Sequence, residues 1–325
     1  MLRCFMSGSA GPILVFLAAV YAVLPATATA EKLVARKGRQ VQAELQAAVG
    51  YRHDNLDWNI AGSSSGTNPN ILSELEWSDL QIVQVKLQGR AVVDGKFYIR
   101  GRVDFGWIVD GDNRDSDYAG DNRTSEFSRS INLSADDEVW DGSLGLGWAF
   151  TFGTDYCRLA PMLGYSVHKQ NLRITDGRQV IPPTGSFAGL NSTYQARWNG
   201  PWIGFDLIFN TPEQRKKGRE TRFLLTAEYH WADYYAEADW NLRSDFQHPK
   251  SFEHDTTGSG LVLGLQWLFG FRFNWDFSLA GQYQKWHTDS GVDRVFLTDG
   301  SRAETMLNEV NWESVEITAG FNYRF

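Results

Sequence analysis

The side chains with the clearest capacity for chemistry form a run of acids between positions 110 and 123. This run, Asp110-Gly-Asp-Asn-Arg-Asp-Ser-Asp-Tyr-Ala-Gly-Asp-Asn-Arg123, contains the closely spaced pair Asp115 and Asp117. Clustered carboxylates can bind a hard cation such as calcium, but the spacing departs from the Asp-x-Asp-x-Asp-Gly pattern with its closing Glu. Asp, Asn and Gly are also ordinary turn residues. The pair is therefore a candidate site without a predicted metal, and a solvated turn is the alternative.

Histidines are the candidates for a base, because imidazole exchanges a proton near neutral pH. His248 and His254 fall between two predicted strands, His287 ends another, and His230 lies on the polar face of a fourth. Cys157 is the single cysteine beyond the N-terminal segment, so neither an internal disulfide nor a thiolate metal cluster is expected. These spacings alone assign no catalytic role.

The elements that must position these side chains are β-strands, as the last eleven residues illustrate. In Val315-Glu-Ile-Thr-Ala-Gly-Phe-Asn-Tyr-Arg-Phe325, apolar side chains alternate strictly with polar or small ones. A period of two indicates a strand whose faces meet different surroundings. In an outer-membrane barrel the apolar face meets lipid and the polar face lines the lumen. A last strand ending in an aromatic residue is also typical of chains that the barrel-assembly machinery recognises.

The N-terminal segment predicts export. Arg3 precedes the apolar run Ile13–Leu24, and Pro25-Ala-Thr-Ala-Thr-Ala30 follows it. A basic start, a short apolar core and small residues are typical of a cleaved signal peptide, residues 1–30. An apolar run of twelve residues is short for a membrane helix, which needs about 20. Residues 31–325 are then the mature barrel.

Ten segments have the composition of strands, and their connections alternate between short and long. The predicted strands are 42–56, 73–91, 96–109, 138–151, 158–172, 193–209, 221–237, 258–269, 272–287 and 310–325. Short turns on one side and long polar loops on the other are typical of outer-membrane barrels. We therefore predict an all-β, transmembrane, antiparallel up-and-down β-barrel of ten strands, with five long extracellular loops and both termini in the periplasm. The formal net charge of −8 argues against a nucleic-acid partner.

A barrel of ten strands encloses a narrow lumen, since open water channels appear at sixteen to eighteen strands. The polar residues predicted to face inward carry charges of both signs: Lys86, Arg90, Arg100, Arg102, Asp104, Glu228, His230, Glu316 and Arg324. This mixture predicts ion pairs that fill the interior. It argues against a general porin.

Several short motifs resemble the omptins, a family of ten-stranded outer-membrane endoproteases. They are Ser73-Glu-Leu-Glu-Trp77, Asp115-Ser-Asp-Tyr118, Met162-Leu-Gly-Tyr165, Arg197-Trp-Asn-Gly-Pro-Trp-Ile-Gly204 and the ending Asn322-Tyr-Arg-Phe325. The number of strands and the order of the loops agree with this resemblance. It implies an omptin-like barrel and a site at the extracellular rim.

The resemblance also implies which residues would form that site. Omptins use a carboxylate pair, matched here by Asp115 and Asp117, and an Asp-x-His pair that activates water. The Asp-x-His positions fall on Ala238 and Trp240, neither of which can act as a base. The resemblance therefore implies a degenerate catalytic site.

Omptins also bind lipopolysaccharide on the outer wall of the barrel, and Tyr165, Lys169 and Arg197 match those positions. The period of two places these side chains on the apolar, outward face. A bound phosphate would offset the cost of cations near lipid; a Lys and an Arg that extend to the interface are the alternative. No other cofactor is expected.

The sequence thus predicts a non-proteolytic omptin-like barrel of the bacterial outer membrane that presents its loops for surface interaction or envelope structure, with an unknown extracellular partner. An endoprotease that uses Asp115 and Asp117 with a rearranged base is the second hypothesis. A small-solute channel is the third.

Overall fold

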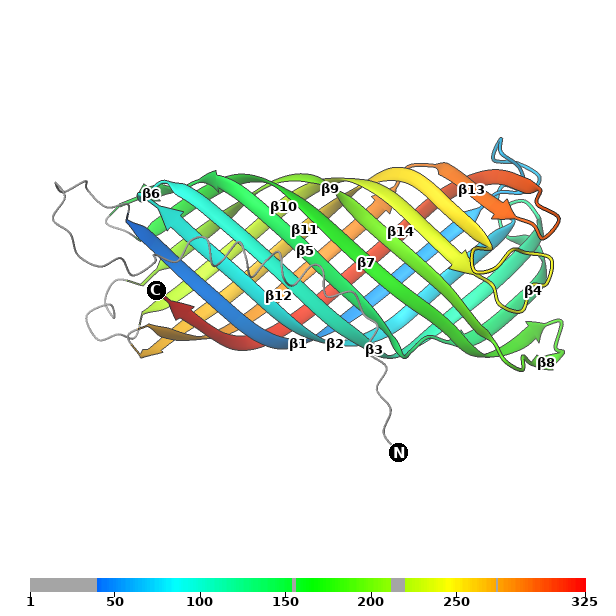
Figure 1. Ribbon diagram of the computed structural model, residues 1–325, viewed down its shortest axis with the longest axis horizontal. Coiled ribbons are helices and arrows are strands. Elements are labelled where there is room, and N and C mark those ends of the chain that lie inside the picture. Colours follow the sequence, from blue (N-terminus) through cyan, green and yellow to red (C-terminus); the bar gives the residue numbers. More distant parts are fainter. Residues whose placement is uncertain (1–39, 154–155, 212–219, 273) are drawn as a thin grey trace, which may run out of the picture. The chain divides into compact units, whose positions relative to one another are not determined.

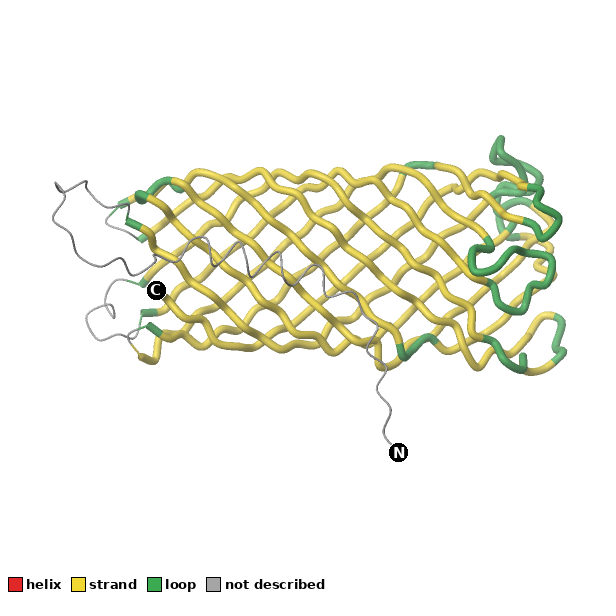
Figure 2. The backbone as a smooth tube through the Cα atoms, viewed as in Figure 1, coloured by secondary structure: helices red, strands yellow, loops and turns green. Residues whose placement is uncertain are grey.

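The computed structural model describes residues 40–325 except 154–155, 212–219 and 273. The predicted signal peptide, residues 1–30, lies outside the described residues. The described chain forms one antiparallel sheet that closes on itself as a barrel (Figures 1 and 2). No helix in this part of the chain is long and apolar enough to cross a membrane.

Ten long strands form the ring, as the sequence predicted. They are β1 (Val41–Ile60), β2 (Ser73–Val93), β3 (Phe97–Gly120), β5 (Asp137–Trp148), β7 (Cys157–Ile181), β9 (Asn191–Asn210), β10 (Thr221–Asp239), β11 (Phe252–Arg272), β12 (Trp275–Thr288) and β14 (Arg302–Arg324). Four shorter strands extend its two ends: β4 (Thr124–Leu133), β6 (Phe150–Phe152), β8 (Gly185–Ser186) and β13 (Gly291–Phe296).

The first and last strands close the barrel. β1 pairs with β14 in a register that sets Tyr51 opposite Ile317 and Glu44 opposite Arg324, which confirms the predicted closure. We call the end where β1 begins and β14 finishes the terminal end, and the opposite end the loop end (Figure 1). β4, β8 and β13 lie at the loop end, and β6 lies at the terminal end.

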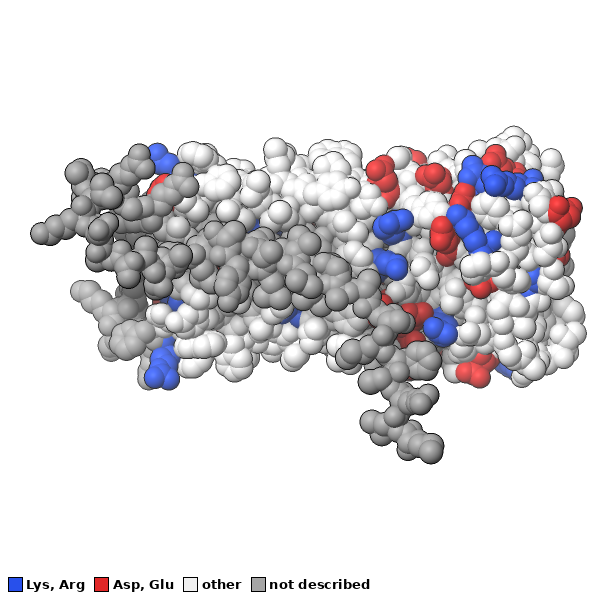
Figure 3. Space-filling view, viewed as in Figure 1, with Lys and Arg blue, Asp and Glu red and all other residues white. Residues whose placement is uncertain are grey.

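The alternation along each strand separates the wall from the lumen. Ile317 and Leu163 expose 62% and 67% of their surface on the outer wall, whereas Glu316 and Thr318 are buried inside. Large stretches of the wall carry no charge, and Lys, Arg, Asp and Glu gather toward the loop end (Figure 3). An uncharged outer band with charges beyond it matches the lipid-facing band of a membrane barrel.

The strands are longer than the sequence predicted, especially at the loop end. The acidic segment was predicted to be a loop, but Asp110 to Gly120 continue β3 and pair with β2 and β4. His254, also predicted in a loop, lies on β11. Polar residues on both faces concealed these strands, because a strand surrounded by water has no apolar side.

Aromatic side chains fill the half of the lumen toward the loop end. Trp286 and Trp312 stack with centroids 5.5 Å apart, and Trp198 packs against both. Above them, Tyr194 lies between Trp58 and Trp77 at 6.0 and 5.0 Å. We call this group, with Tyr234 and Phe252, the aromatic plug; it belongs to one continuous buried apolar cluster.

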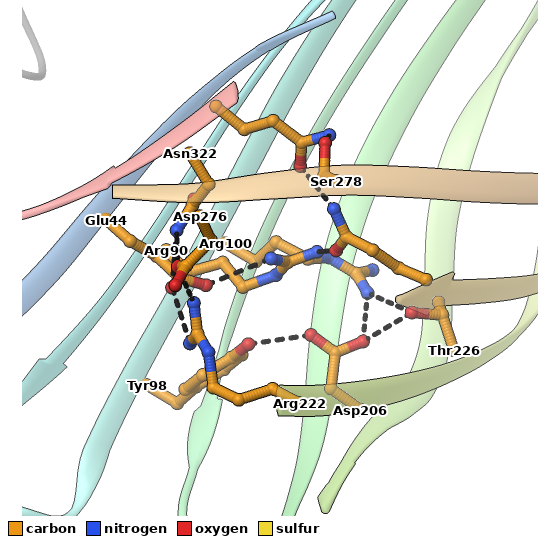
Figure 4. A network of polar contacts seen from close by, with 12 residues as sticks. Glu44, Arg90, Tyr98, Arg100, Asp206, Arg222, Thr226, Asp276, Ser278 and Asn322 are labelled. Carbon is orange, nitrogen blue, oxygen red and sulfur yellow. Dashed lines mark hydrogen bonds and ion pairs between the residues drawn. The ribbon is translucent and has the colours of Figure 1, made fainter. Parts of the chain in front are cut away.

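Ion pairs fill the half toward the terminal end, as the mixed charge of the inward set predicted. Arg100 pairs with both Asp206 and Glu228, and Lys86 pairs with Glu316. Nearer the end, the carboxylates of Glu44 and Asp276 each lie 2.7 Å from Arg222 (Figure 4). We call this group the ionic network.

A layer of buried histidines separates the two halves. His168 contacts Trp286 at 4.8 Å, and its Nδ1 lies 2.8 Å from the Asp141 carboxylate, which also binds Arg52. His230 lies 2.9 Å from Glu228 and 3.0 Å from the Ser166 hydroxyl. All these side chains are buried, so they tie the aromatic plug to the ionic network.

Candidate functional site

The acid pair Asp115 and Asp117 lies on the inner face of β3 at the loop end. Strand register places Asp115 between Leu75 of β2 and Ser130 of β4, and Leu75 is fully buried in the plug's apolar cluster. Asp117, two residues on, lies between Ser73 and Ser128 in the strand register. The pair is thus held by strand pairing at the mouth of the lumen.

The other acids of the segment point elsewhere. Asp112 is exposed on the outer face, and Asp121 caps the turn by accepting a hydrogen bond from the Asn70 amide at 2.8 Å. Within the described residues, no group of three or more His, Cys, Asp or Glu side chains could hold a metal ion. The alternation of the strand therefore spreads the acids between faces instead of gathering them around a cation.

The two carboxyls hold their protons more tightly than ordinary aspartates. Burial, followed by repulsion from Asp117, raises the pKa of Asp115 to about 8, and burial also raises the pKa of Asp117. The charge that opposes this shift comes from Arg243, which lowers the pKa of both carboxyls. Among the described residues, Asp117 and Arg243 are the charged groups that act on Asp115.

Arg243 occupies the loop that follows β10, and its guanidinium is firmly oriented. It binds Asp245 through two hydrogen bonds of 2.9 and 2.8 Å and lies 4.0 Å from the centroid of the Phe246 ring. The sequence analysis missed this residue. A single arginine in a polar loop carries no motif, and its electrostatic effect on the acid pair depends on the folded barrel.

The positions of the missing Asp-x-His pair belong to the aromatic plug. Ala238 is buried opposite Phe252 of β11. Trp240 lies against the same Phe252 ring, with centroids 4.7 Å apart. An indole here extends the apolar packing toward the mouth, where a base would need access to water.

Two histidine–aspartate pairs do occur in this region, one on the outward face and one buried in the lumen. His248 Nδ1 lies 2.5 Å from Asp239 Oδ1, but Asp239 shares the outward face of β10 with Glu237. His254 Nε2 lies 3.2 Å from Asp293, yet both side chains are buried within the lumen. Among the described residues, each imidazole is thus paired with a carboxylate other than Asp115 or Asp117.

The buried pair is fixed by its own hydrogen bonds. His254 Nδ1 lies 2.9 Å from the Tyr194 hydroxyl, and Asp293 accepts a hydrogen bond of 2.9 Å from Thr305. The Trp58 ring stands edge-on to His254 at 4.8 Å. These contacts make the pair a polar bridge inside the aromatic plug.

A second candidate surface lies on the outer wall. Strand register aligns Trp140, Lys169, Arg197 and Tyr235 in one row across β5, β7, β9 and β10. Arg197 lies 5.8 Å from the Tyr235 ring, and a groove of about 290 Å³ runs along the row. Tyr165 is half exposed on the same wall, where Asn199 donates to its hydroxyl at 3.3 Å. The three predicted wall residues therefore do share one outward face.

Comparison with solved structures gives the fold. The outer-membrane protease OmpT of Escherichia coli superimposes with a TM-score of 0.70 at 12% identity, covering 87% of this chain and 97% of OmpT. The translocator domain of the autotransporter NalP from Neisseria meningitidis gives 0.35 at 10% identity, covering 86% and 88%. The OmpT superposition shows that the chain has an omptin-like barrel, as the motifs predicted.

Comparison of sequences gives the family. No curated protein sequence matches the chain at a significant level. The family model described as Pom, Protochlamydia outer membrane protein, matches residues 46–325, which is nearly the whole barrel. This match and the fold together establish a bacterial outer-membrane protein. The chain belongs to the Protochlamydia outer membrane protein family.

Proposed function

We propose that this protein is a non-proteolytic barrel that presents its loop end as a binding surface of the outer membrane. One observation carries the proposal: an indole and a methyl group occupy the positions of the base and its orienting acid, and the cation that acts electrostatically on the acid pair is the Arg243 guanidinium. Arginine stays protonated at every physiological pH and so cannot accept a proton from water. Among the described residues, the charged side chains at the loop end therefore include no proton acceptor at the position of the base.

The sealed lumen supports the same proposal. The aromatic plug lies directly below the acid pair, and ion pairs fill the other half. A ligand that reaches Asp115 and Asp117 would approach from the loop end. The plug also argues against the third hypothesis, a small-solute channel, because a pore needs a continuous aqueous path.

An endoprotease remains the second candidate, and one observation favours it. The pKa of Asp115, about 8, lies close to the pH at which a general base is most effective. In that case Asp115 would accept the proton and Asp117 would orient the water. Arg243 weakens this candidate. Its positive charge favours the ionised form of the pair, which lowers the pKa of Asp115 and makes its carboxylate a weaker base.

A peptide-cleavage assay separates the two candidates. The refolded full chain, in micelles containing lipopolysaccharide, would be mixed with fluorogenic peptides that carry paired basic residues. We expect no cleavage above buffer from the wild type or from Asp115→Ala. A second arm restores the missing groups with Ala238→Asp and Trp240→His. Wild-type cleavage that disappears in Asp115→Ala would overturn the proposal, whatever the restored variant does.

We also propose that the outer-wall row binds the phosphates of lipopolysaccharide. Lys169 and Arg197 lie directly opposite each other on neighbouring strands, and like charges in that position destabilise a sheet. No ion pair with a carboxylate is found for either side chain within the described residues. A bound phosphate would supply the missing negative charge, and Tyr165 and Trp140 would lie beside the acyl chains.

A further inference from the structure

Four arginines converge inside the lumen at the terminal end, far from the acid pair. Three of them meet carboxylates: Arg90 pairs with Glu44 at 3.0 Å, Arg222 with Glu44 and Asp276, and Arg324 with Glu220 at 2.9 Å. The fourth is Arg158, near the start of β7. The carboxylates that pair with the other three arginines are Glu44, Asp276 and Glu220.

Arg158 has an inward position and no partner for its charge. It shares the inward face of β7 with the buried residues Ala160 and Met162, and strand register places it opposite Ile208. Within the described residues, no hydrogen bond or ion pair joins its guanidinium to another side chain, and its Nε is buried without a partner. A buried N–H without a partner is unfavourable, so this group favours a ligand.

A cavity gives this guanidinium room for a ligand. Its volume is about 290 Å³, and Arg158 shares the lining with Arg90, Arg222 and Arg324. Val92 and Ile208 supply apolar walls, Glu44 and Glu220 also line it, and Tyr98 lines it beside its hydrogen bond to Asp206. The cavity lies among the strand ends, so it opens away from the aromatic plug.

We propose that this cavity binds a small oxyanion, a carboxylate or a phosphate, with Arg158 as its principal ligand. The planar guanidinium fork matches two oxygens of either group, and a charge-assisted pair is about twice as strong as a neutral hydrogen bond. An orphan N–H would gain an acceptor when the anion binds.

The expected orientation of the barrel identifies the source of the anion. The terminal end faces the periplasm in a barrel of even strand number whose long loops lie outside. The ligand is then either free phosphate or a carboxylate, including one at the end of a peptide. The site is independent of the proposed function at the loop end, so each can fail alone.

Isothermal titration calorimetry on the refolded full chain in micelles tests the site. Sodium phosphate, sodium acetate and a dipeptide with a free carboxyl terminus would each be titrated, with sodium chloride at equal ionic strength as the reference. We expect saturable binding of at least one of the three, weakened at least tenfold by Arg158→Gln and less by Arg158→Lys. Phosphate binding without acetate or dipeptide binding would identify phosphate as the ligand, and the reverse would identify a carboxylate.

Two further variants make the test specific. Arg272→Gln removes an exposed arginine at the same end that does not line the cavity, and it should bind like the wild type. Ile208→Glu keeps Arg158 but gives it an internal carboxylate, and it should lose binding as fully as Arg158→Gln. Heat-dependent migration on a gel checks that each barrel is folded. Binding equal to chloride for all three anions, or equal binding by Arg158→Gln, would overturn the proposal.

Discussion

The two halves of the lumen are filled by opposite kinds of side chain. Toward the loop end, stacked and edge-on rings exclude water through apolar contact. Toward the terminal end, arginines and carboxylates exclude it by pairing, with Arg100 between two acids and Arg222 between two more. Apolar packing is non-directional, whereas an ionic network works only when each charge meets its partner.

This difference bears on function. In the half toward the loop end, apolar packing closes the lumen below the acid pair. Trp240 is part of that packing. The terminal half is incomplete, because one arginine of its network lacks a partner among the described residues. The closed lumen at the loop end is consistent with a binding surface there, and the unpaired arginine at the terminal end is consistent with a bound ligand.

The stability of the barrel should be more sensitive to truncation of a single side chain in the ionic network than in the aromatic plug. Arg100→Ala would leave Asp206 and Glu228 as buried carboxylates without their main partner. We expect the free energy of unfolding to fall by about 3–5 kcal/mol. Urea unfolding of the refolded protein in micelles, followed by tryptophan fluorescence, measures it. The exposed Arg272→Ala is the control, and a loss as small as the control's would show that the pairs are not dry.

The aromatic half should tolerate a conservative change better. Trp286→Phe keeps a ring against Trp312 and His168 but leaves a gap. We expect a loss of about 2 kcal/mol in the same urea experiment, because partial repacking offsets the lost contacts. Trp231→Phe, on the exposed wall, should change the stability by much less. A loss larger than that of Arg100→Ala would reverse the comparison.

Much of this architecture could be predicted from sequence, for a physical reason. Lipid on one side and a filled lumen on the other impose a period of two, and so all ten ring strands and their closure were found, as at Tyr51 and Ile317. The extensions of the strands beyond the membrane were missed. There both faces of β3 meet water or polar groups, and the signal from apolar alternation vanishes at Asp110.

The candidate site was only partly predictable. Asp115 and Asp117 could be found because they are close in sequence, and their shared inward face followed from their spacing. Arg243 could not, since it acts on them electrostatically from a loop more than a hundred residues away in the sequence. The pairing of Asp239 with His248 was also not predicted. It lies on the outward face of β10, whereas the acid pair lies on the inward face of β3.

The acid pair gives the loop end a pH dependence of known sign. The pKa of Asp115 is about 8 in the folded chain against 3.8 in the unfolded one. Between about pH 4 and 8 the folded chain keeps a proton that the unfolded chain has lost, so stability falls as pH rises. Asp115→Asn should remove this fall, gaining about 1–2 kcal/mol over the wild type by pH 8, after allowance for partial exposure.

Urea titrations of both proteins at several pH values measure this effect. Asp112→Asn, on the exposed outer face of the same strand, is the matched control and should keep the wild-type profile. A difference between Asp115→Asn and the wild type that stays constant from pH 4 to 8 would contradict the raised pKa.

The outer wall should show the smallest effect. Lys169→Ala and Arg197→Ala should each weaken lipopolysaccharide binding about tenfold, or about 1.4 kcal/mol, because each removes one cation from the row. Native mass spectrometry of the refolded protein with lipopolysaccharide measures the bound fraction. Lys285→Ala changes an exposed lysine on β12 and should bind normally. Equal binding by all variants would favour two cations that simply extend to the interface.

The central claim is that the acid pair at the loop end faces no base that can activate water. It is tested most directly by the rate at which the wild-type full chain cleaves a peptide with paired basic residues, measured from pH 5 to 9. We predict a rate equal to buffer at every pH, because Trp240 and Ala238 occupy the positions of the base and its orienting acid and neither can accept a proton. A rate that rises through the pKa of Asp115, near pH 8, and vanishes in Asp115→Ala would contradict it.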